Sequence, residues 1–153
     1  DANFTLINSQ TTYQNSYVHL VQTGTDSRGR PIYQLTRVDS VYSGPMLNQP
    51  KRLMNFSFGY NYKGFNLWLS YQYTGLMVTS EPAMKEFESR TSGLALWDLQ
   101  ITQELPMKGL SLVFDLANIS NPTQYQNDLG DSRPTYLENY GWTADFGIRA
   151  SVF

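Results

Sequence analysis

The carboxylates of this sequence are the residues best suited to do chemistry. Asp98, Glu104, Asp115 and Asp145 fall in segments where apolar and polar residues alternate, and each takes a polar position. Because side chains on a β-strand point alternately to opposite faces, the four acids are expected to share one face of a sheet. A suitably spaced pair of carboxyl groups can hydrolyse a glycosidic bond, one as an acid and the other as a base or nucleophile.

A simpler interpretation is that these acids are solvated or paired with a cation, with Arg149 and Arg52 as the candidate partners. The chain contains one histidine, His19, and no cysteine. This composition excludes thiolate nucleophiles, cysteine–zinc sites and histidine-rich metal centres. We therefore expect no enzyme activity, no metal site and no cofactor.

Two pairs of predicted strands hold most of these acids. In each pair one face is almost wholly Phe, Tyr, Leu and Ile, and the other carries Asn, Ser, Gln, Thr, Asp and Glu. Such a sheet requires an apolar medium on one side and water or a polar filling on the other. The strands are 53–62 and 65–73, joined by a tight turn at 63–64, and 97–105 and 110–116, joined by a turn at 106–109.

The connections predict a sheet whose two ends differ. Short turns lie at one end, and the other end carries long loops at 75–93 and 118–141, before a last strand from Trp142 to Phe153. Short periplasmic turns, long outer loops and strands of about 9–11 residues are typical of outer-membrane barrels. Aromatic residues at the strand ends fit the interfacial girdles of such a barrel, namely Tyr60 and Tyr62, Tyr71 and Tyr73, and Tyr140 and Trp142.

The chain divides into two parts on this interpretation. Residues 53–153 are the antiparallel transmembrane strands of an all-β barrel, and residues 1–52 form an outer strand or two with an extracellular loop. Within the first part, 17–21 and 32–38 resemble strands that project into water, because their alternation is weak and a polar, turn-rich connector separates them.

The composition supports a β-protein with one very apolar face. Tyr occurs 11 times and Phe 8 times, whereas charged residues make up only 16% of the chain, against about a quarter in typical domains. The net charge is −2, and Lys and Arg form no cluster, so nucleic acid is not an expected partner. No apolar run approaches the roughly 20 residues of a membrane helix.

Two alternatives remain open at this stage. One is a self-contained eight-stranded membrane barrel, acting as an adhesin or structural protein. The other is a soluble β-sandwich that binds carbohydrate on Trp and Tyr faces, in which the apolar faces form an ordinary core. Trp68, an aromatic residue on a polar face, is either a binding platform or a packing contact with whatever fills the interior. The residues expected to face the barrel lumen are Trp68, Asp98, Asp115, Asp145 and Arg149.

The last hundred residues resemble the C-terminal end of TonB-dependent outer-membrane receptors. The motifs that carry the resemblance run in order from about residue 50 to the end of the chain. They are Pro50-Lys51-Arg52-Leu53, Asn55-Phe56-Ser57-Phe58-Gly59-Tyr60, Lys63-Gly64-Phe65, Trp97-Asp98-Leu99, Lys108-Gly109-Leu110-Ser111-Leu112, Leu116-Ala117-Asn118-Ile119-Ser120-Asn121, and Tyr140 to Arg149 with the terminal Phe153.

The resemblance implies the C-terminal strands of a larger barrel, one of 22 strands, in the bacterial outer membrane. Its implied partners are outer-membrane lipid, the remaining barrel and plug portion, TonB through that plug, and a small nutrient such as an iron chelate, cobalamin or glycan. In such receptors the ligand lies between the outer loops and the plug, which predicts binding residues in the two long loops: Glu81, Tyr125, Gln126, Asp131, Arg133 and Tyr136.

One departure from the family pattern concerns the chain end. The outward positions of the last strand run from Trp142 to Val152, which leaves Phe153 on the opposite parity from the terminal residue of the family. A β-bulge near the end would restore the outward direction of Phe153.

Overall fold

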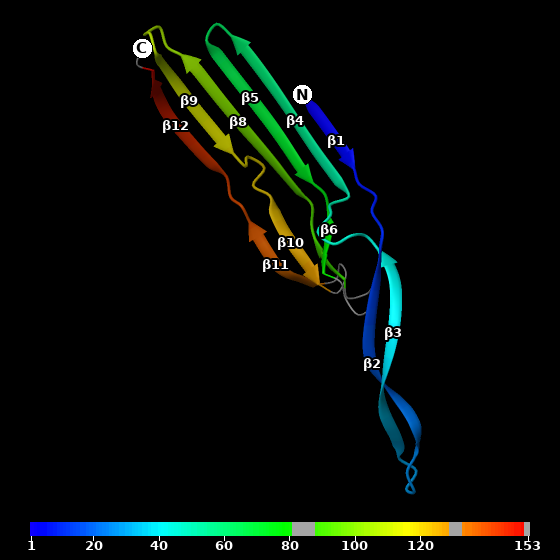
Figure 1. Ribbon diagram of the computed structural model, residues 1–153. Coiled ribbons are helices and arrows are strands. Elements are labelled where there is room, and N and C mark those ends of the chain that lie inside the picture. Colours follow the sequence, from blue (N-terminus) through cyan, green and yellow to red (C-terminus); the bar gives the residue numbers. More distant parts are fainter. Residues whose placement is uncertain (81–87, 129–132, 152–153) are drawn as a thin grey trace.

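The computed structural model describes residues 1–80, 88–128 and 133–151 (Figure 1). These residues form an all-β structure of antiparallel sheets. The described residues form no helix, and therefore no helix that is long and apolar enough to cross a membrane.

The largest element is a six-stranded antiparallel sheet in the order β1-β4-β5-β8-β9-β12. The five strands of this sheet that follow residue 50 are adjacent in chain order, and β1 is added at the outer edge next to β4. The strands are β1 (Ala2–Leu6), β4 (Arg52–Tyr62), β5 (Phe65–Thr74), β8 (Leu94–Glu104), β9 (Leu110–Ala117) and β12 (Thr143–Ala150).

Register places the apolar residues of these strands on one face. Pairing aligns Tyr60 with Leu67, Leu67 with Ile101, Ile101 with Phe114, and Phe114 with Phe146 in a single row across the sheet. Since alternate residues share a face, the rows on either side of it belong to the same face, and they are apolar or aromatic except for Gln103. The predicted two-faced sheet is therefore present.

The two predicted short turns are confirmed. Tyr62 pairs with Phe65 across Lys63 and Gly64, which have φ angles of 46° and 78°. Two residues with positive φ make a type I′ turn, whose twist matches that of the flanking strands. In the second turn, Leu105 N donates to Leu110 O at 2.9 Å and closes the four residues 106–109.

The strands deviate from the predicted bounds at the end of the chain. β12 was predicted over 142–153 and spans only Thr143–Ala150, whereas β9, predicted over 110–116, spans Leu110–Ala117. β12 ends at Ala150, and Ser151 N donates to Gly109 O at 2.7 Å. The prediction about the direction of Phe153 lies outside the described residues.

The stretches 75–93 and 118–141 were predicted as long loops, and the structure corrects this prediction. Each contains paired strands, which together form a second sheet in the order β11-β10-β7-β6 at the end of the first (Figure 1). These strands are mostly polar and show little alternation of apolar and polar residues, so the sequence indicated them only weakly. The strands are β6 (Met77–Ser80), β7 (Ser89–Thr91), β10 (Thr123–Asp128) and β11 (Arg133–Asn139).

A long two-stranded hairpin extends from the same end of the molecule (Figure 1). It consists of β2 (Thr11–Thr25) and β3 (Pro31–Gly44), so the two predicted strands at 17–21 and 32–38 are present but much longer than expected. Its tip is held by Asp26, whose carboxylate accepts hydrogen bonds from the amides of Arg30 and Arg28 at 2.9 and 2.8 Å and from the Arg30 guanidinium at 2.8 Å. These bonds, first the one from the Arg30 amide, lower the pKa of Asp26.

The described part of the chain has no hydrophobic core of ordinary size. Val78, at 6% exposed, is its only buried hydrophobic residue, and no large side chain is fully buried. The accessible surface is 11030 Å², roughly 3,000 Å² more than the about 7,900 Å² expected for a compact protein of 17.5 kDa. The six-stranded sheet is thus a single layer with both faces open.

Candidate functional site

The polar face of the six-stranded sheet carries one continuous row of candidate residues. Gly59 pairs with Trp68, Trp68 with Gln100, Gln100 with Asp115, and Asp115 with Asp145. The row crosses five strands, so the register brings together three of the five residues that were expected to face the lumen.

Trp68 forms a half-exposed aromatic platform in this row. Its ring lies over Gly59 so closely that a Cβ at Gly59 would come within 2.7 Å of two ring carbons. Trp68 as a whole is 49% exposed, and beside it is a shallow depression lined by Leu67 and by the polar residues Asn61, Asn66, Gln100 and Thr102. A flat ring with amide groups around it suits contact with a polar ligand or with another polypeptide.

Asp115 and Asp145 lie directly opposite one another on neighbouring strands. Directly opposed residues of an antiparallel pair have Cβ atoms about 4.5–5.5 Å apart, and like charges at that spacing destabilise the sheet. Neither acid takes part in an ion pair with the described residues. Asp145 is exposed and Asp115 is partly exposed on this face.

Asp98 has a structural role that the sequence did not indicate. Its carboxylate accepts a hydrogen bond from the backbone amide of Asn118 at 2.8 Å. Asn118 has a φ angle of 58°, which asparagine tolerates better than most residues, and its side-chain amide donates to the carbonyl oxygen of Gly141. Asp98 therefore anchors the turn at the end of β9 and, through it, the segment that leads into β12.

The two arginines suggested as partners of the acids do not pair with them. Arg149 is on the polar face, but it is opposite Ser111, with Glu104 one strand further. Arg52 pairs in register with Leu6 and shares the parity of Met54, which places it on the apolar face. The suggestion that Arg52 neutralises a lumen-facing acid is wrong, because the alternation of β4 directs it to the other side.

The loop-end sheet divides the predicted ligand residues between its two faces. Gln126 is opposite both Tyr136 and Thr91, whereas Tyr125 is opposite Leu137. Neighbouring residues on a strand face opposite ways, so Gln126 and Tyr136 are brought together and Tyr125 is separated from them. Arg133 begins β11, but its side chain lies outside the described part, as do Glu81 and Asp131.

Tyr140 completes a polar cluster with two residues that the sequence did not single out. Its hydroxyl oxygen lies 3.0 Å from Gln124 Oε1 and 3.2 Å from Glu138 Oε2, both acceptors. Gln124 in turn donates to the carbonyl oxygen of Ser92 at 3.3 Å. Partial desolvation, and then the negative charge of Glu138, raise the pKa of Tyr140, so the hydroxyl keeps its proton at neutral pH.

This cluster shares a face with Gln126 and Tyr136, because Gln124 pairs with Glu138 two positions along the same strands. The face thus carries two tyrosines, two glutamines and one glutamate. Tyr136 is 57% exposed, and Tyr140 is 45% exposed. Such a surface offers aromatic rings and neutral hydrogen-bonding groups with little charge. The sequence signal that could have identified this face is spacing at every second position, which puts Gln124 with Gln126 on one side of a strand and Tyr136 with Glu138 and Tyr140 on one side of the next.

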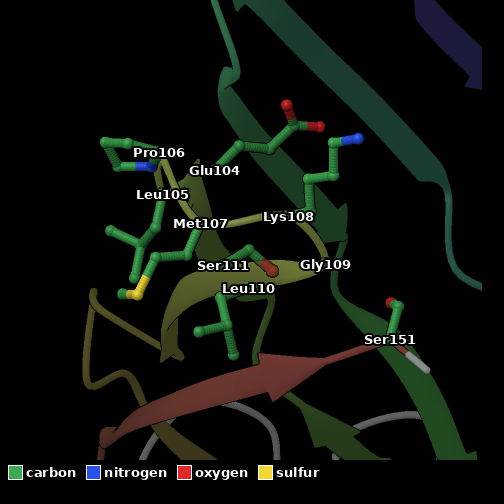
Figure 2. Close-up of a pocket in the computed structure, with 9 residues that line it drawn as sticks. All are labelled: Glu104, Leu105, Pro106, Met107, Lys108, Gly109, Leu110, Ser111 and Ser151. Atoms are coloured by element: carbon green, nitrogen blue, oxygen red, sulfur yellow. The ribbon is translucent and has the colours of Figure 1, made fainter. Parts of the chain in front are cut away.

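A further hollow of about 400 Å³ lies at the opposite end of the molecule, around the 106–109 turn. Figure 2 shows that Glu104 and Lys108 extend to one side of the turn and Leu105 and Met107 to the other. Glu104 and Lys108 do not form an ion pair within 4.0 Å in the described structure. The hollow is the inner surface of a hairpin turn, and no set of convergent groups points to chemistry there.

Comparison with protein-family models, with curated proteins and with solved structures found no match. Among the residues 1–80, 88–128 and 133–151, no three His, Cys, Asp or Glu side chains gather closely enough to hold a metal ion. The geometry of the two sheets is therefore the basis for assigning a function.

Proposed function

We propose that this chain forms the C-terminal part of the barrel wall of a TonB-dependent outer-membrane receptor. In this role its strands cross the outer membrane and its loop end helps to capture a scarce nutrient, such as an iron chelate, cobalamin or a glycan. Import would be driven by rearrangement of the plug portion through TonB, so no residue of this chain needs to catalyse a reaction.

The observation that carries the proposal is the single-layered six-stranded sheet with one exposed apolar face. Large apolar side chains on it remain open, including Phe4, Phe58 and Phe146, the last 72% exposed. A face of this kind is unfavourable in water, and soluble proteins rarely expose apolar patches of more than a few hundred Å². Lipid on this side and water or a plug on the other would satisfy both faces.

The dimensions and the ends of the sheet support the same environment. Five of the six strands have 8–11 residues, close to the length of tilted membrane strands, whereas β1 has 5. Aromatic pairs lie on the apolar face near both ends, Tyr60 with Phe65 at 6.4 Å between ring centroids and Tyr71 with Trp97 at 4.5 Å. Rings at these positions fit two interfacial girdles.

The edges of the sheet indicate that other strands complete it. In the described residues, β1 and β12 each pair on one side only. An unpaired strand edge is not tolerated in hydrocarbon, because its backbone groups cannot bond to water. We infer that both edges pair with further strands of the receptor. The open sheet therefore favours this proposal over a self-contained eight-stranded barrel, since β2 and β3 form a separate hairpin.

For ligand capture, the strongest candidates are Gln126 and Tyr136 together with the adjoining Gln124, Glu138 and Tyr140. Their rings and amides can contact a polar nutrient without strong charge selection. Tyr125, on the other face of the loop-end sheet, remains a candidate. Glu81, Asp131 and Arg133 also remain candidates from the sequence alone.

Membrane extraction tests the proposal. The protein should stay in the membrane pellet after high salt and alkaline washing, dissolve only in detergent, and purify with a much larger barrel portion, whether in the same polypeptide or in a second one. A chain that is released by buffer and remains a folded monomer would contradict the proposal and favour a soluble carbohydrate-binding domain.

A further inference from the structure

We propose that the apolar face holds a binding site for a phosphate-bearing anionic lipid, centred on Arg52. The site rests on the proposed function, because it requires that this face meets lipid. It is a groove of about 510 Å³ at the loop end of the sheet, lined by Phe4, Leu6, Arg52, Met54, Tyr71 and Tyr73.

The register orders the groove along the direction of a lipid molecule. Arg52 and Leu6 form the outermost pair, Phe4, Met54 and Tyr73 form the next row, and Tyr71 belongs to the row after that. Successive rows on one face are about 7 Å apart along the strands. Arg52 thus lies at the outer end of the groove, and the aromatic and aliphatic residues of the groove follow it toward the middle of the sheet.

Arg52 is exceptional on this face. Among the described residues of the six strands, all other positions with the same orientation are uncharged, and most are apolar. Its side chain is exposed and forms none of the three ion pairs of the described structure. A charged side chain directed at hydrocarbon calls for a named partner, and no carboxylate of the described residues supplies one.

The space beside Arg52 is open because of Gly75. The amide of Gly75 donates to the carbonyl oxygen of Arg52 at 2.8 Å, so the two residues are neighbours across β4 and β5. A Cβ at Gly75 would lie 3.2 Å from the Arg52 Cβ, so any larger residue would crowd the arginine stem. With glycine there, the guanidinium can approach a headgroup without competition from a cross-strand side chain.

The chemistry of the lining selects an anionic lipid. A guanidinium binds phosphate with two parallel hydrogen bonds and is less strongly hydrated than an ammonium group, which suits an interface. The aromatic and methionine side chains that line the rest of the groove provide apolar contact for an acyl chain. One of them, Tyr71, packs against the ring of Trp97, with 4.5 Å between ring centroids. The positive charge of Arg52 thus favours a lipid with net negative charge in the groove.

The test compares three forms of the protein, purified from membranes in neutral detergent with all the strands that complete its sheet. These are the wild type, Arg52→Gln, and Lys51→Gln as a matched control. Lys51 is the adjacent cation in the sequence; it precedes β4 and is not among the residues that line the groove. Each form is placed in nanodiscs of phosphatidylcholine containing a minority of phosphatidylglycerol with the same chains, and the retained lipids are measured by native mass spectrometry.

We expect the wild type and Lys51→Gln to retain phosphatidylglycerol in preference to phosphatidylcholine, and Arg52→Gln to lose about tenfold of that preference. Excess inorganic phosphate should not displace the lipid, because a free anion lacks the acyl-chain contacts. A fourth form, Tyr73→Ala, is added to test the apolar contact and should retain less of both lipids.

Three outcomes would overturn the inference. An unchanged preference in Arg52→Gln would show that the arginine only extends to the interface. An equal loss in Lys51→Gln would show a general charge effect. In both cases the protein would still be embedded in the disc, so the proposed receptor function would stand. If no form inserts into nanodiscs, the proposed function and the lipid site fail together.

Discussion

The two faces of the six-stranded sheet are built on the same backbone and differ almost completely in chemistry. One face places rows of Phe, Tyr, Leu and Ile side by side and has a single cation, Arg52, at its edge. The other places Trp68, Gln100, Asp115 and Asp145 in one row. Neither face is covered by the described chain, so the proposed function requires a different medium on each side of the sheet.

The largest expected effect comes from placing a charge on the apolar face. Phe146→Lys should lower the free energy of unfolding in lipid vesicles by about 2–4 kcal/mol, because a charged side chain near the bilayer centre is strongly unfavourable. The matched control is Gly147→Lys, the next residue, where an added side chain would meet nothing within 4 Å. On a face exposed to water both changes would stay within about 0.5 kcal/mol, which would remove the distinction between the faces.

A smaller effect is expected where the polar face is tightly packed. Gly59→Ala must displace the Trp68 ring, since the new Cβ would lie 2.7 Å from it. We expect a loss of about 1–2 kcal/mol in stability and a shift of Trp68 fluorescence. Gly147→Ala serves as the control, and equal stabilities of the two variants would show that Trp68 does not rest on Gly59.

The opposed acids should give a modest gain. At neutral pH, Asp145→Asn should stabilise the protein by about 0.2–1 kcal/mol, because it removes the like charge directly opposite Asp115. Asp98→Asn should act in the other direction by weakening the bond to the Asn118 amide. Denaturant titration of both variants separates the two roles, and a destabilised Asp145→Asn would mean that this carboxylate has a favourable partner.

The smallest effect is expected at the hairpin tip, which is far from both faces. The folded pKa of Asp26 is lowered, so its contribution is present above the ordinary carboxyl pKa near 4 and is lost as pH falls through the folded value. The amides of Arg28 and Arg30 donate to the Asp26 carboxylate, so their protection from exchange, measured relative to the intrinsic rate at each pH, should fall on acidification. Asp26→Asn should remove that pH dependence of the protection. A pH-dependent tip in Asp26→Asn would assign the effect to another group.

The sequence predicted the parts of the fold whose signals are local. Alternation located β4, β5, β8 and β9, and Lys63-Gly64 marked a two-residue turn that the structure confirms. The loop-end strands were missed because Thr123 to Asp128 is wholly polar apart from Tyr125, and Pro134 interrupts the next strand. Their pairing depends on long-range partners such as Thr91, which local patterns do not reveal.

The candidate site was predictable only in part, for the same reason. Trp68, Asp98, Asp115, Asp145 and Arg149 were assigned to one face by parity, and their parity on the strands agrees with that. Which acid faces which neighbour depends on register between strands, so the anchoring role of Asp98 and the opposed pair Asp115 and Asp145 could not be foreseen. The placement of Arg52 could have been foreseen, since its spacing from Met54 already put it on the apolar side.

The central claim, that lipid covers the apolar face, can be tested by labelling two neighbouring residues. The chain contains no cysteine, so Phe58→Cys and Ser57→Cys each introduce one labelling position in it, on opposite faces of β4. In lipid vesicles, a fluorophore at position 58 should be quenched by a lipid-borne nitroxide and not by aqueous iodide, and one at position 57 should show less lipid quenching. If iodide quenches both positions equally, or if position 58 is shielded from both quenchers, the face does not contact lipid.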